Sequence, residues 1–367
     1  MKTSNSGARR LERIAASPRW DGERFHNTHA TPRGSAPMPS IKDFLCGGER
    51  RVPDGPLPTV NPLEHLGSRP QSDLRATWLG HSTVLVEIDG WRVLTDPVWG
   101  PRASPTRFAG PKRFQPVPVA MSDLPRLDAV LISHDHYDHL DFTTMRVLRK
   151  VNVPIVTSLG VGAHLECFGI APERIVELDW WETHRVPGTG LTFTATPSQH
   201  FSGRGLKDGN KTLWSSWAIV GARHKVFFSG DTGLTPEYAE TRNRVGEFDL
   251  VMLEIGAFHP AWSGIHLGPE NALAAHALLG GGPLLPIHWG TFNLALHPWD
   301  DPIEKLVELA PKSGARLVLP KLGQPVEPAH DLRIDPWWRG VSAKPGKPAV
   351  VEPPPESLPN GMPWPID

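Results

Sequence analysis

The segment of the chain with the clearest chemistry is residues 134–139, His-Asp-His-Tyr-Asp-His, which places three imidazoles and two carboxylates within six residues. Adjacent side chains in a tight loop diverge, so one ion cannot collect them all, whereas alternate residues point the same way. His134 and His136 can therefore face one point, and Asp138 and His139 can reach a second. Nitrogen and carboxylate ligands without cysteine favour zinc over iron or manganese. The alternative is a solvated loop that binds metal incidentally, which the constrained spacing disfavours.

Three further polar residues each follow an apolar run, as a ligand at a strand end would. They are His200, Asp231 and His288. A single histidine after a strand is more often structural than a ligand. Three such residues, in this order downstream of the first motif, instead favour a ligand set that completes two metal sites.

The elements that must position these residues read as strands separated by helices and turns. Strand-like runs occupy residues 83–88, 92–95, 128–133, 154–158, 191–196, 216–220, 225–229, 249–255, 284–287 and 316–320. Helix-like patterns cover 141–150, 269–279 and 302–309. Because the candidate ligands extend from residue 134 to residue 288, one large domain is a simpler interpretation than two.

The two ends of the chain differ in composition from its middle. Residues 1–70 are rich in Arg, Pro, Gly and Ser, and they predict an irregular N-terminal arm. Residues 341–367 predict an extended, Pro-rich C-terminal tail. Residues 71–330 are then expected to form the domain that carries the candidate site.

Composition limits the partners and the compartment. A net charge of −1 gives no electrostatic case for a nucleic-acid partner. The two cysteines, Cys46 and Cys167, make no disulfide framework and fit a reducing compartment. No apolar run approaches the length of a membrane span, and none follows the basic N-terminus as in a signal peptide. We therefore expect a cytoplasmic protein, and the sequence leaves open whether it forms a homo-oligomer.

The order of the candidate ligands resembles the pattern of the metallo-β-lactamase-fold hydrolases, which is His-x-His-x-Asp-His, then His, Asp and His. The resemblance covers roughly residues 74–325. It implies an α/β fold, an αββα sandwich of two mixed sheets flanked by helices, with two Zn²⁺ ions at one edge of the sheets. It assigns His134, His136 and His200 to one ion and Asp138, His139 and His288 to the other, with Asp231 bridging the two.

Longer motifs narrow this resemblance to N-acylphosphatidylethanolamine-hydrolysing phospholipase D and its bacterial relatives. They occupy residues 78–86, 94–97, 102–105, 110–114, 177–182, 197–200, 213–217 and 287–292. That family is a dizinc phosphodiesterase, so the resemblance implies cleavage of N-acylphosphatidylethanolamine-like lipids to N-acylethanolamine and phosphatidic acid. A zinc pair lowers the pKa of a shared water from about 15.7 toward 7, which would supply the attacking hydroxide.

Residues beyond the ligands complete the expected site. His266 lies in the stretch where the family carries a histidine implicated in catalysis, so we expect it to protonate the leaving group or to bind phosphate. Asp231 would act in catalysis by fixing the metal separation. Substrate binding is expected of His266, of Trp262 in a Gly-rich loop, and of Arg107. Ile265, which precedes His266, and Arg107 both stand where the family has Gln. Both differences change the polar lining of the expected substrate site.

Two residues ahead of the first motif are candidates for orienting the ligand imidazoles. Asp96 follows the strand-like run 92–95, and Ser133 directly precedes His134. Metal-bound imidazoles commonly donate their other ring N–H to such an outer partner. The alternative for both residues is an ordinary turn or cap.

Tryptophan is unusually abundant, with 14 Trp against 2 Tyr. Indole rings favour the boundary between membrane and water, which is consistent with a lipid-facing groove and peripheral contact with a membrane. The alternative is that the rings fill a large core, and we favour it for Trp180 and Trp217, which lie on strand-like segments.

Two other functions stay open at this stage. A lactonase, or another small-molecule ester or phosphoester hydrolase of the same fold, would use the same hydroxide on a different substrate. A non-catalytic, envelope-associated metal-binding protein is the more remote alternative. Structural zinc sites are closed by four protein ligands, whereas each ion here would keep an open position.

Overall fold

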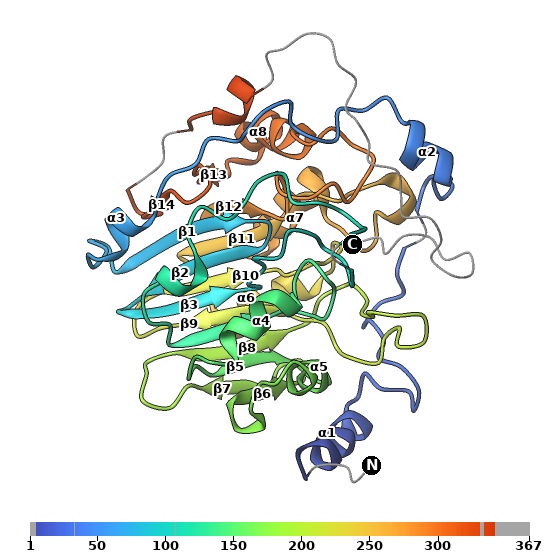
Figure 1. Ribbon diagram of the computed structural model, residues 1–367, viewed down its shortest axis with the longest axis vertical. Coiled ribbons are helices and arrows are strands. Elements are labelled where there is room, and N and C mark those ends of the chain that lie inside the picture. Colours follow the sequence, from blue (N-terminus) through green and yellow to red (C-terminus); the bar gives the residue numbers. More distant parts are fainter. Residues whose placement is uncertain (1–4, 33, 107, 331–333, 342–367) are drawn as a thin grey trace.

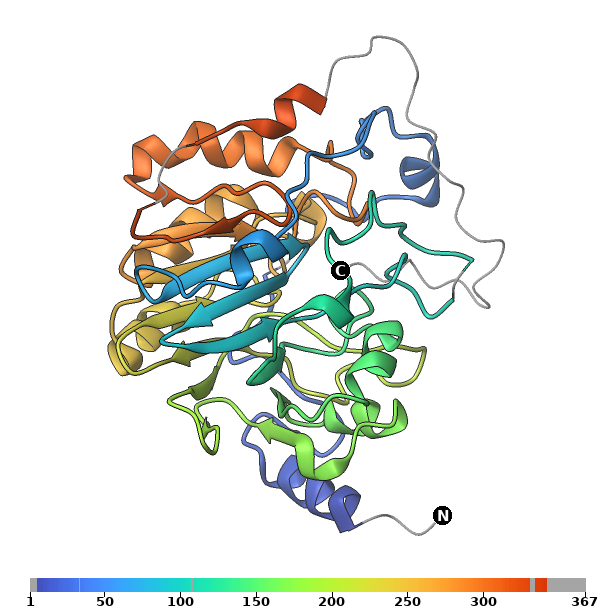
Figure 2. The same cartoon turned by 60° about the vertical axis from the view of Figure 1, so that its left-hand side comes forward.

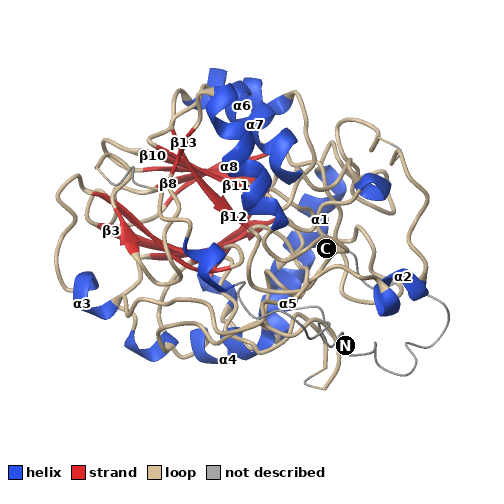
Figure 3. Ribbon diagram, turned by 90° about the horizontal axis from the view of Figure 1, so that it is seen from above, coloured by secondary structure: helices blue, strands red, loops and turns tan. Residues whose placement is uncertain are grey.

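The computed structural model describes residues 5–32, 34–106, 108–330 and 334–341 (Figure 1). Arg107 and nearly all of the Pro-rich tail therefore lie outside the described residues. The described chain forms an αββα sandwich, as predicted, with two sheets packed face to face between outer helices (Figure 3).

Each sheet has seven strands among the described residues. The first sheet has the order β14 (Pro325–Val326), β1 (Leu74–Gly80), β2 (Thr83–Ile88), β3 (Trp91–Thr95), β4 (Ala129–Ile132), β5 (Ile155–Ser158) and β6 (Ile175–Leu178). The second has the order β13 (Arg316–Leu317), β12 (Pro283–Ile287), β11 (Leu250–Glu254), β10 (Lys225–Phe228), β9 (Ser216–Val220), β8 (Thr192–Thr196) and β7 (Thr183–Arg185).

Both sheets are mixed in the same way. Strands β1, β2 and β3 pair antiparallel, and β3 to β6 then pair parallel. In the second sheet β8, β9 and β10 pair antiparallel, and β10 to β13 pair parallel. Strands β1, β3, β4, β8, β10, β11 and β12 consequently all end at the same edge of the sandwich, where ligand-binding sites of such sheets form.

Helices cover the two outer faces of the sandwich (Figure 3). Helices α4 (Phe142–Leu148) and α5 (Gly162–Cys167) pack on the first sheet. Helices α6 (Glu237–Val245), α7 (Gly268–Leu278) and α8 (Asp301–Ser313) pack on the second. None of the described helices combines the length and the apolar character needed to cross a lipid bilayer.

Strand β4 shows why the strand preceding the metal motif is apolar throughout. Ala129 and Leu131 face the core between the sheets, whereas Val130 and Ile132 face the helices of the first layer. A strand buried on both faces reads as a continuous apolar run rather than an alternating one. The four residues are fully buried, so β4 holds the following loop on a rigid support.

The predicted strands all correspond to strands of the sandwich, but β1, β6, β7 and β14 were missed. Strand β1 contains Arg75, which does not fit a strand buried over its whole length. The cross-strand pairing of Arg75 with Glu87, whose side chains are 2.5 Å apart, explains how the charge is accommodated. Such a pairing depends on the register of two strands and is not visible in either strand alone.

The N-terminal arm is more regular than predicted, since it contains α1 (Asn5–Ala16), α2 (Ile41–Cys46) and α3 (Leu63–Leu66). Helix α1 is held by Arg10, whose guanidinium lies 2.6 Å from Glu166 and 2.6 Å from Glu177. Tertiary contacts of this kind stabilise short helices that propensity alone does not predict. Helices α1 and α2 lie at opposite ends of the molecule (Figures 1 and 2), so the arm spans its length.

Candidate metal centre

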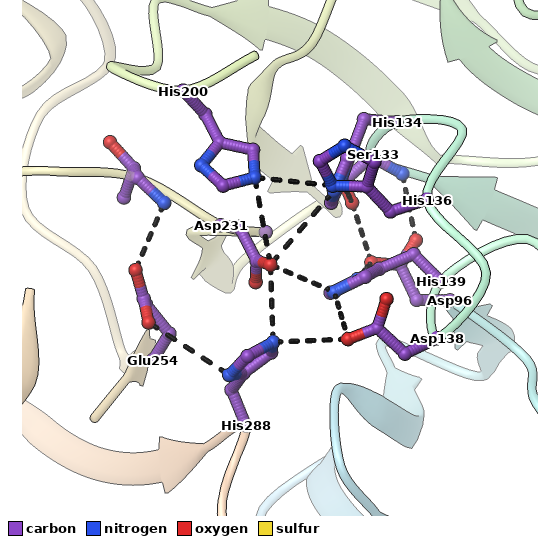
Figure 4. A network of polar contacts seen from close by, with 12 residues as sticks. Asp96, Ser133, His134, His136, Asp138, His139, His200, Asp231, Glu254 and His288 are labelled. Carbon is purple, nitrogen blue, oxygen red and sulfur yellow. Dashed lines mark hydrogen bonds and ion pairs between the residues drawn. The ribbon is translucent and has the colours of Figure 1, made fainter. Parts of the chain in front are cut away.

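All seven predicted ligands lie together at the common edge of the two sheets (Figure 4). The loop after β4 carries four of them, and the ends of β8, β10 and β12 lead to the other three. Each of the seven side chains is buried. The structure therefore assembles residues that are up to 154 positions apart, from 134 to 288, at one place.

The first cluster consists of His134, His136, His200 and Asp231. Nδ1 of His136 lies 2.8 Å from Nε2 of His134 and 3.3 Å from Nε2 of His200. Oδ2 of Asp231 lies 3.9 Å from His134 and 3.8 Å from His200. Three ring nitrogens and one carboxylate oxygen thus converge on one point, which matches the donor set of a zinc site.

The second cluster consists of Asp138, His139, His288 and a residue that the sequence prediction did not include, His81. Nε2 of His139 and Nε2 of His288 each lie 3.4 Å from Oδ2 of Asp138. The same two nitrogens lie 3.0 Å and 3.1 Å from Oδ2 of Asp231. Oδ2 of Asp231 therefore lies within 4 Å of ring nitrogens of both clusters.

His81 contacts the second cluster through Asp138. Its Nε2 lies 2.7 Å from Oδ2 of Asp138, and its ring centroid lies 4.0 Å from that of His288. Burial lowers the pKa of His81 to about 3, so the ring is neutral. With its Nε2–H donating to the carboxylate, His81 orients Asp138. His81 lies in the motif 78–86, but it does not follow an apolar run, which is the feature that identified the other candidate ligands.

Several buried oxygen and nitrogen atoms of the centre lack hydrogen bonds and could instead coordinate metal cations. Both carboxylate oxygens of Asp231 and Nε2 of His139 and His288 are buried without hydrogen-bond geometry to any described residue, despite their short separations. Leaving such groups buried and unsatisfied costs free energy. Coordination of metal ions between them would satisfy all four atoms at once, so the donor set fits a pair of divalent metals.

Electrostatics support the same interpretation. Burial, followed by the neighbouring imidazoles, lowers the pKa of His134 well below its ordinary value, so the ring is in the neutral form that binds metal. Burial also opposes a charge on His288, yet the carboxylates of Asp231 and Asp138 raise its pKa to about 10. The second cluster thus attracts positive charge, which a metal cation would supply.

Asp96 fixes the ligands on the first sheet. Its Oδ2 accepts hydrogen bonds from Nδ1–H of His139 at 2.6 Å and from the hydroxyl of Ser133 at 2.6 Å, and its Oδ1 accepts one from the Ser133 amide at 2.7 Å. The Ser133 oxygen in turn lies 2.9 Å from Nδ1 of His134. Asp96 and Ser133 therefore hold two ligand rings, directly and through a hydroxyl, as outer partners of metal ligands do.

Glu254 has the corresponding place on the second sheet and was not predicted. Its Oε1 accepts hydrogen bonds from the amides of Thr232 at 3.0 Å and Leu267 at 3.1 Å, and its Oε2 lies 3.0 Å from Nδ1 of His266. The carboxylate therefore joins the loop after β10 to the segment before α7. The one signal in the sequence was an acidic residue closing the apolar run of β11.

His266, the candidate catalytic residue, lies beside the two candidate metal clusters. It is fully buried, and its ring centroid lies 5.2 Å from that of His200 and 5.4 Å from that of His288. Glu254 accepts from Nδ1–H, whereas Nε2 has no hydrogen-bond partner among the described residues. The ring therefore has one nitrogen fixed and one available for a reacting group.

His200 is positioned by two backbone contacts from distant segments. Its Nδ1–H donates to the carbonyl of Ile265 at 2.9 Å, a main-chain contact that does not use the side chain of residue 265. Asn27 of the arm brackets the main chain of His200, accepting from its N–H at 3.1 Å and donating to its carbonyl at 2.8 Å. The part played by Asn27 was not predictable from the sequence.

Three residues of the centre adopt the left-handed backbone conformation that favours glycine. They are His81 at φ +54°, Asp96 at φ +30° and His288 at φ +62°. Non-glycine residues in this region carry strain that the surrounding structure must sustain, and such residues concentrate at functional sites.

Trp262 is buried, with 5% of its surface exposed. Its indole N–H donates to the carbonyl of Ala257 at 2.8 Å, and its ring stacks on His259 with centroids 4.5 Å apart. The structure thus gives this residue a packing role and adds no support for the predicted substrate contact.

Comparison with known proteins agrees with this geometry. A family model described as "Beta-lactamase superfamily domain" matches residues 91–289. An uncharacterised protein of Mycobacterium tuberculosis is 47% identical over 78% of this chain and 77% of its own length. A protein of Caenorhabditis elegans named N-acyl-phosphatidylethanolamine-hydrolyzing phospholipase D 1 is 39% identical over 71% of this chain and 76% of its own length.

Among solved structures, an isothiocyanate hydrolase from gut bacteria of Delia radicum aligns with a TM-score of 0.56 at 22% identity. The alignment covers 69% of this chain and 98% of that one. A metallo hydrolase of Ignicoccus hospitalis aligns with a TM-score of 0.53, also at 22% identity, over 69% of this chain and 97% of the other. Both likenesses concern the fold.

Proposed function

The chain belongs to the metallo-β-lactamase superfamily of metal-dependent hydrolases, and from this premise we propose that it is a binuclear zinc phosphodiesterase of the phospholipase D type. Its substrates would be N-acylphosphatidylethanolamine-like lipids, cleaved to N-acylethanolamine and phosphatidic acid. The observation that carries the proposal is the 39% identity to the Caenorhabditis elegans relative of that name, over 71% of the chain.

The proposed ligands fall into two groups with one shared member. His134, His136 and His200 would hold one zinc ion, Asp138, His139 and His288 the other, and Asp231 both. When bound, such a metal pair makes hydroxide available near neutral pH and stabilises the attacking and leaving oxygens of a phosphoryl centre. Asp231 would act in catalysis by keeping the two clusters at a constant separation.

His266 is the proposed general acid. Glu254 carries no proton to donate when ionised, so Nδ1 of His266 holds the ring proton in their contact. Nε2, which has no partner among the described residues, would face the reacting groups. A proton carried on Nε2 would pass to the departing ethanolamide oxygen, while Glu254 stabilises the charged ring. A poorly acidic alcohol needs such a donor, which typically accelerates a reaction about 10²–10⁴-fold.

Peripheral contact with a lipid surface is part of the proposal. Phe108, in the loop between β3 and β4, has 90% of its surface exposed, and Leu206, in the loop between β8 and β9, has 50% exposed. Both loops leave the sheet edge that carries the metal centre. Exposed apolar side chains at such loops favour insertion at a membrane interface.

The decisive experiment presents purified protein with N-acylphosphatidylethanolamine in mixed micelles and identifies the products by mass spectrometry. We expect phosphatidic acid and N-acylethanolamine in equal amounts. Release of diacylglycerol or of fatty acid alone would show that another bond is cut. Turnover of a lactone panel without turnover of the lipid would replace the proposal with the lactonase alternative.

A further inference from the structure

A small cavity of about 20 Å³ adjoins the candidate ligand His288. Its walls come from three parts of the chain: the segment after β12, which includes Phe292, His297 and Trp299, Ala257 after β11, and Arg51 of the N-terminal arm. A cavity of this size accommodates about one or two water molecules or one small polar group of a larger ligand. Of the residues in the two metal clusters, His288 alone is among the cavity's lining residues.

Apart from the candidate ligand His288, whose two ring nitrogens are also unpartnered, three nitrogen atoms of the cavity's lining side chains are buried without a partner among the described residues. They are Nε of Arg51, Nε1 of Trp299 and Nε2 of His297. Arg51 and Trp299 are only 2% and 3% exposed. The other two guanidinium nitrogens of Arg51 donate to the carbonyls of Phe44 at 3.0 Å and Asp43 at 2.8 Å, so the arm fixes the group in place.

His297 differs from the other two because it presents an acceptor. Its Nδ1 lies 2.8 Å from the carbonyl of Pro298, which can only accept, so Nδ1 carries the proton. Burial lowers the pKa of His297 to about 4, which keeps the ring neutral. The ring stacks on Phe258 with centroids 4.6 Å apart, and its Nε2 lone pair is left for a donor.

We propose that this cavity is a subsite for the amide group of the substrate. The amide carbonyl would accept from Arg51 and Trp299, and the amide N–H would donate to Nε2 of His297. The assignment rests on the proposed function, because only there does an amide follow the scissile oxygen across the ethylene bridge of ethanolamine. A cavity adjoining a metal ligand is at a suitable place for the group next to the scissile bond.

The donor and acceptor pattern distinguishes an amide from a phosphate. An ionised phosphate has only hydrogen-bond acceptors. One of its oxygens would lie opposite the Nε2 lone pair of His297, where no hydrogen bond can form. The charge of Arg51 is also partly met by Glu49, whose Oε2 lies 3.4 Å from Nη2. A neutral group with both a carbonyl and an N–H satisfies all three nitrogens, and buried polar groups strongly discriminate against ligands that leave them unpaired.

The test uses two small ligands that differ in one atom, N-butyrylethanolamine and its ester analogue 2-hydroxyethyl butyrate. Binding to the metal-loaded full-length protein would be followed by ligand-observed NMR, with the integrity of the ester checked by chromatography. We expect the amide to bind about 10-fold more tightly, because the ester lacks the N–H and sets an oxygen against His297. Equal binding would overturn the proposal and leave the cavity to water.

Two variants test which side chain binds the amide N–H and which binds the carbonyl. His297→Phe keeps a ring on Phe258 but removes the acceptor, so it should erase the preference for the amide. Trp299→Phe removes a donor to the carbonyl, which both ligands possess, so it should weaken both by about 3–10-fold and keep the preference. The matched control is Trp217→Phe, because Trp217 also has a buried, unpartnered indole N–H but does not line the cavity.

The control and the variants also separate this proposal from the proposed function. Weakening by Trp217→Phe equal to that of Trp299→Phe would contradict the subsite, as would a preference for the amide that survives His297→Phe. Failure of lipid hydrolysis with an intact, His297-dependent amide preference would instead contradict the phosphodiesterase proposal alone. Thermal unfolding of each variant verifies that it is folded before binding is measured.

Discussion

The two sheets of the sandwich contribute to the metal centre in different ways. The first sheet supplies four of the seven candidate ligands from one loop after β4, whereas the second supplies His200, Asp231 and His288 from three separate strand ends. When one loop after a buried strand carries several ligands, those ligands are close together in the sequence and form a short motif. Ligands that follow several different strands form one metal site only when the parallel strands bring their ends to a common edge.

The carboxylates that hold the site residues in place also differ between the two sheets. On the first sheet, Asp96 holds His139 directly and His134 through Ser133, so it serves metal ligands. On the second sheet, Glu254 holds His266 and two backbone amides, and its distance to His288 is 4.0 Å. Under the proposed function, the first sheet would chiefly bind metal, whereas the second sheet would also supply the acid–base group.

The largest effect is expected where the two sheets meet, at Asp231. Asp231→Ala should lower the metal content from the expected two zinc ions per chain and abolish activity, because two cations would lose their shared negative charge. The loss should exceed the roughly 10–100-fold typical of an outer partner. Elemental analysis and lipid turnover would measure it, with Asp335→Ala, an exposed residue paired to Lys321, as the control. Wild-type protein that retains a single ion after zinc supplementation would contradict the binuclear proposal.

The next effect tests the chemical role of the second sheet. His266→Ala should keep both metals but lower kcat for the lipid by about 10²–10⁴-fold, the usual range for a general acid. The loss should shrink sharply with a p-nitrophenyl phosphodiester, whose leaving group departs without a proton. Equal losses on both substrates, chiefly in KM, would indicate phosphate binding instead.

Replacing the two outer carboxylates compares the sheets directly. Asp96→Asn should weaken zinc binding by about 10–100-fold and leave the ratio of lipid to p-nitrophenyl turnover unchanged. Glu254→Gln should reproduce the leaving-group dependence of His266→Ala in a milder form and retain both metals. Zinc titration and paired kinetics measure both properties. If both variants lost metal and neither changed the turnover ratio, the functional division between the sheets would be wrong.

The smallest effect concerns support from the arm. Asn27→Ala removes both contacts to the main chain of His200, which should destabilise the fold by about 1–3 kcal/mol and lower activity slightly. Thermal unfolding with and without zinc measures the change. Asn61→Ala is a matched control, because Asn61 is exposed and its side chain accepts only from Leu63 among the bonds of the described structure. A similar loss in both variants would show that His200 does not depend on the arm.

The difference between the sheets also explains what the sequence could predict. The loop at 134–139 is a local pattern, and the apolar runs before His200, Asp231 and His288 placed them at strand ends, so the principal cluster was foreseeable. The parts played by His81, Glu254 and Asn27 were not, because each acts through a partner at least 12 residues away. Strand β1 was missed for the same reason, since Arg75 is compatible with burial only beside Glu87.

The course of the N-terminal arm has a practical consequence for cloning. A gene fragment cut to the family match, residues 91–289, would encode all seven candidate ligands. It would omit Arg10, which ties α1 to β6 through Glu177, as well as Asn27 and Arg51. Such a fragment would keep the candidate ligands but lose Asn27, which holds the main chain of His200, and the contacts made by Arg10 and Arg51 of the arm. The smallest expression clone worth making therefore starts before α1.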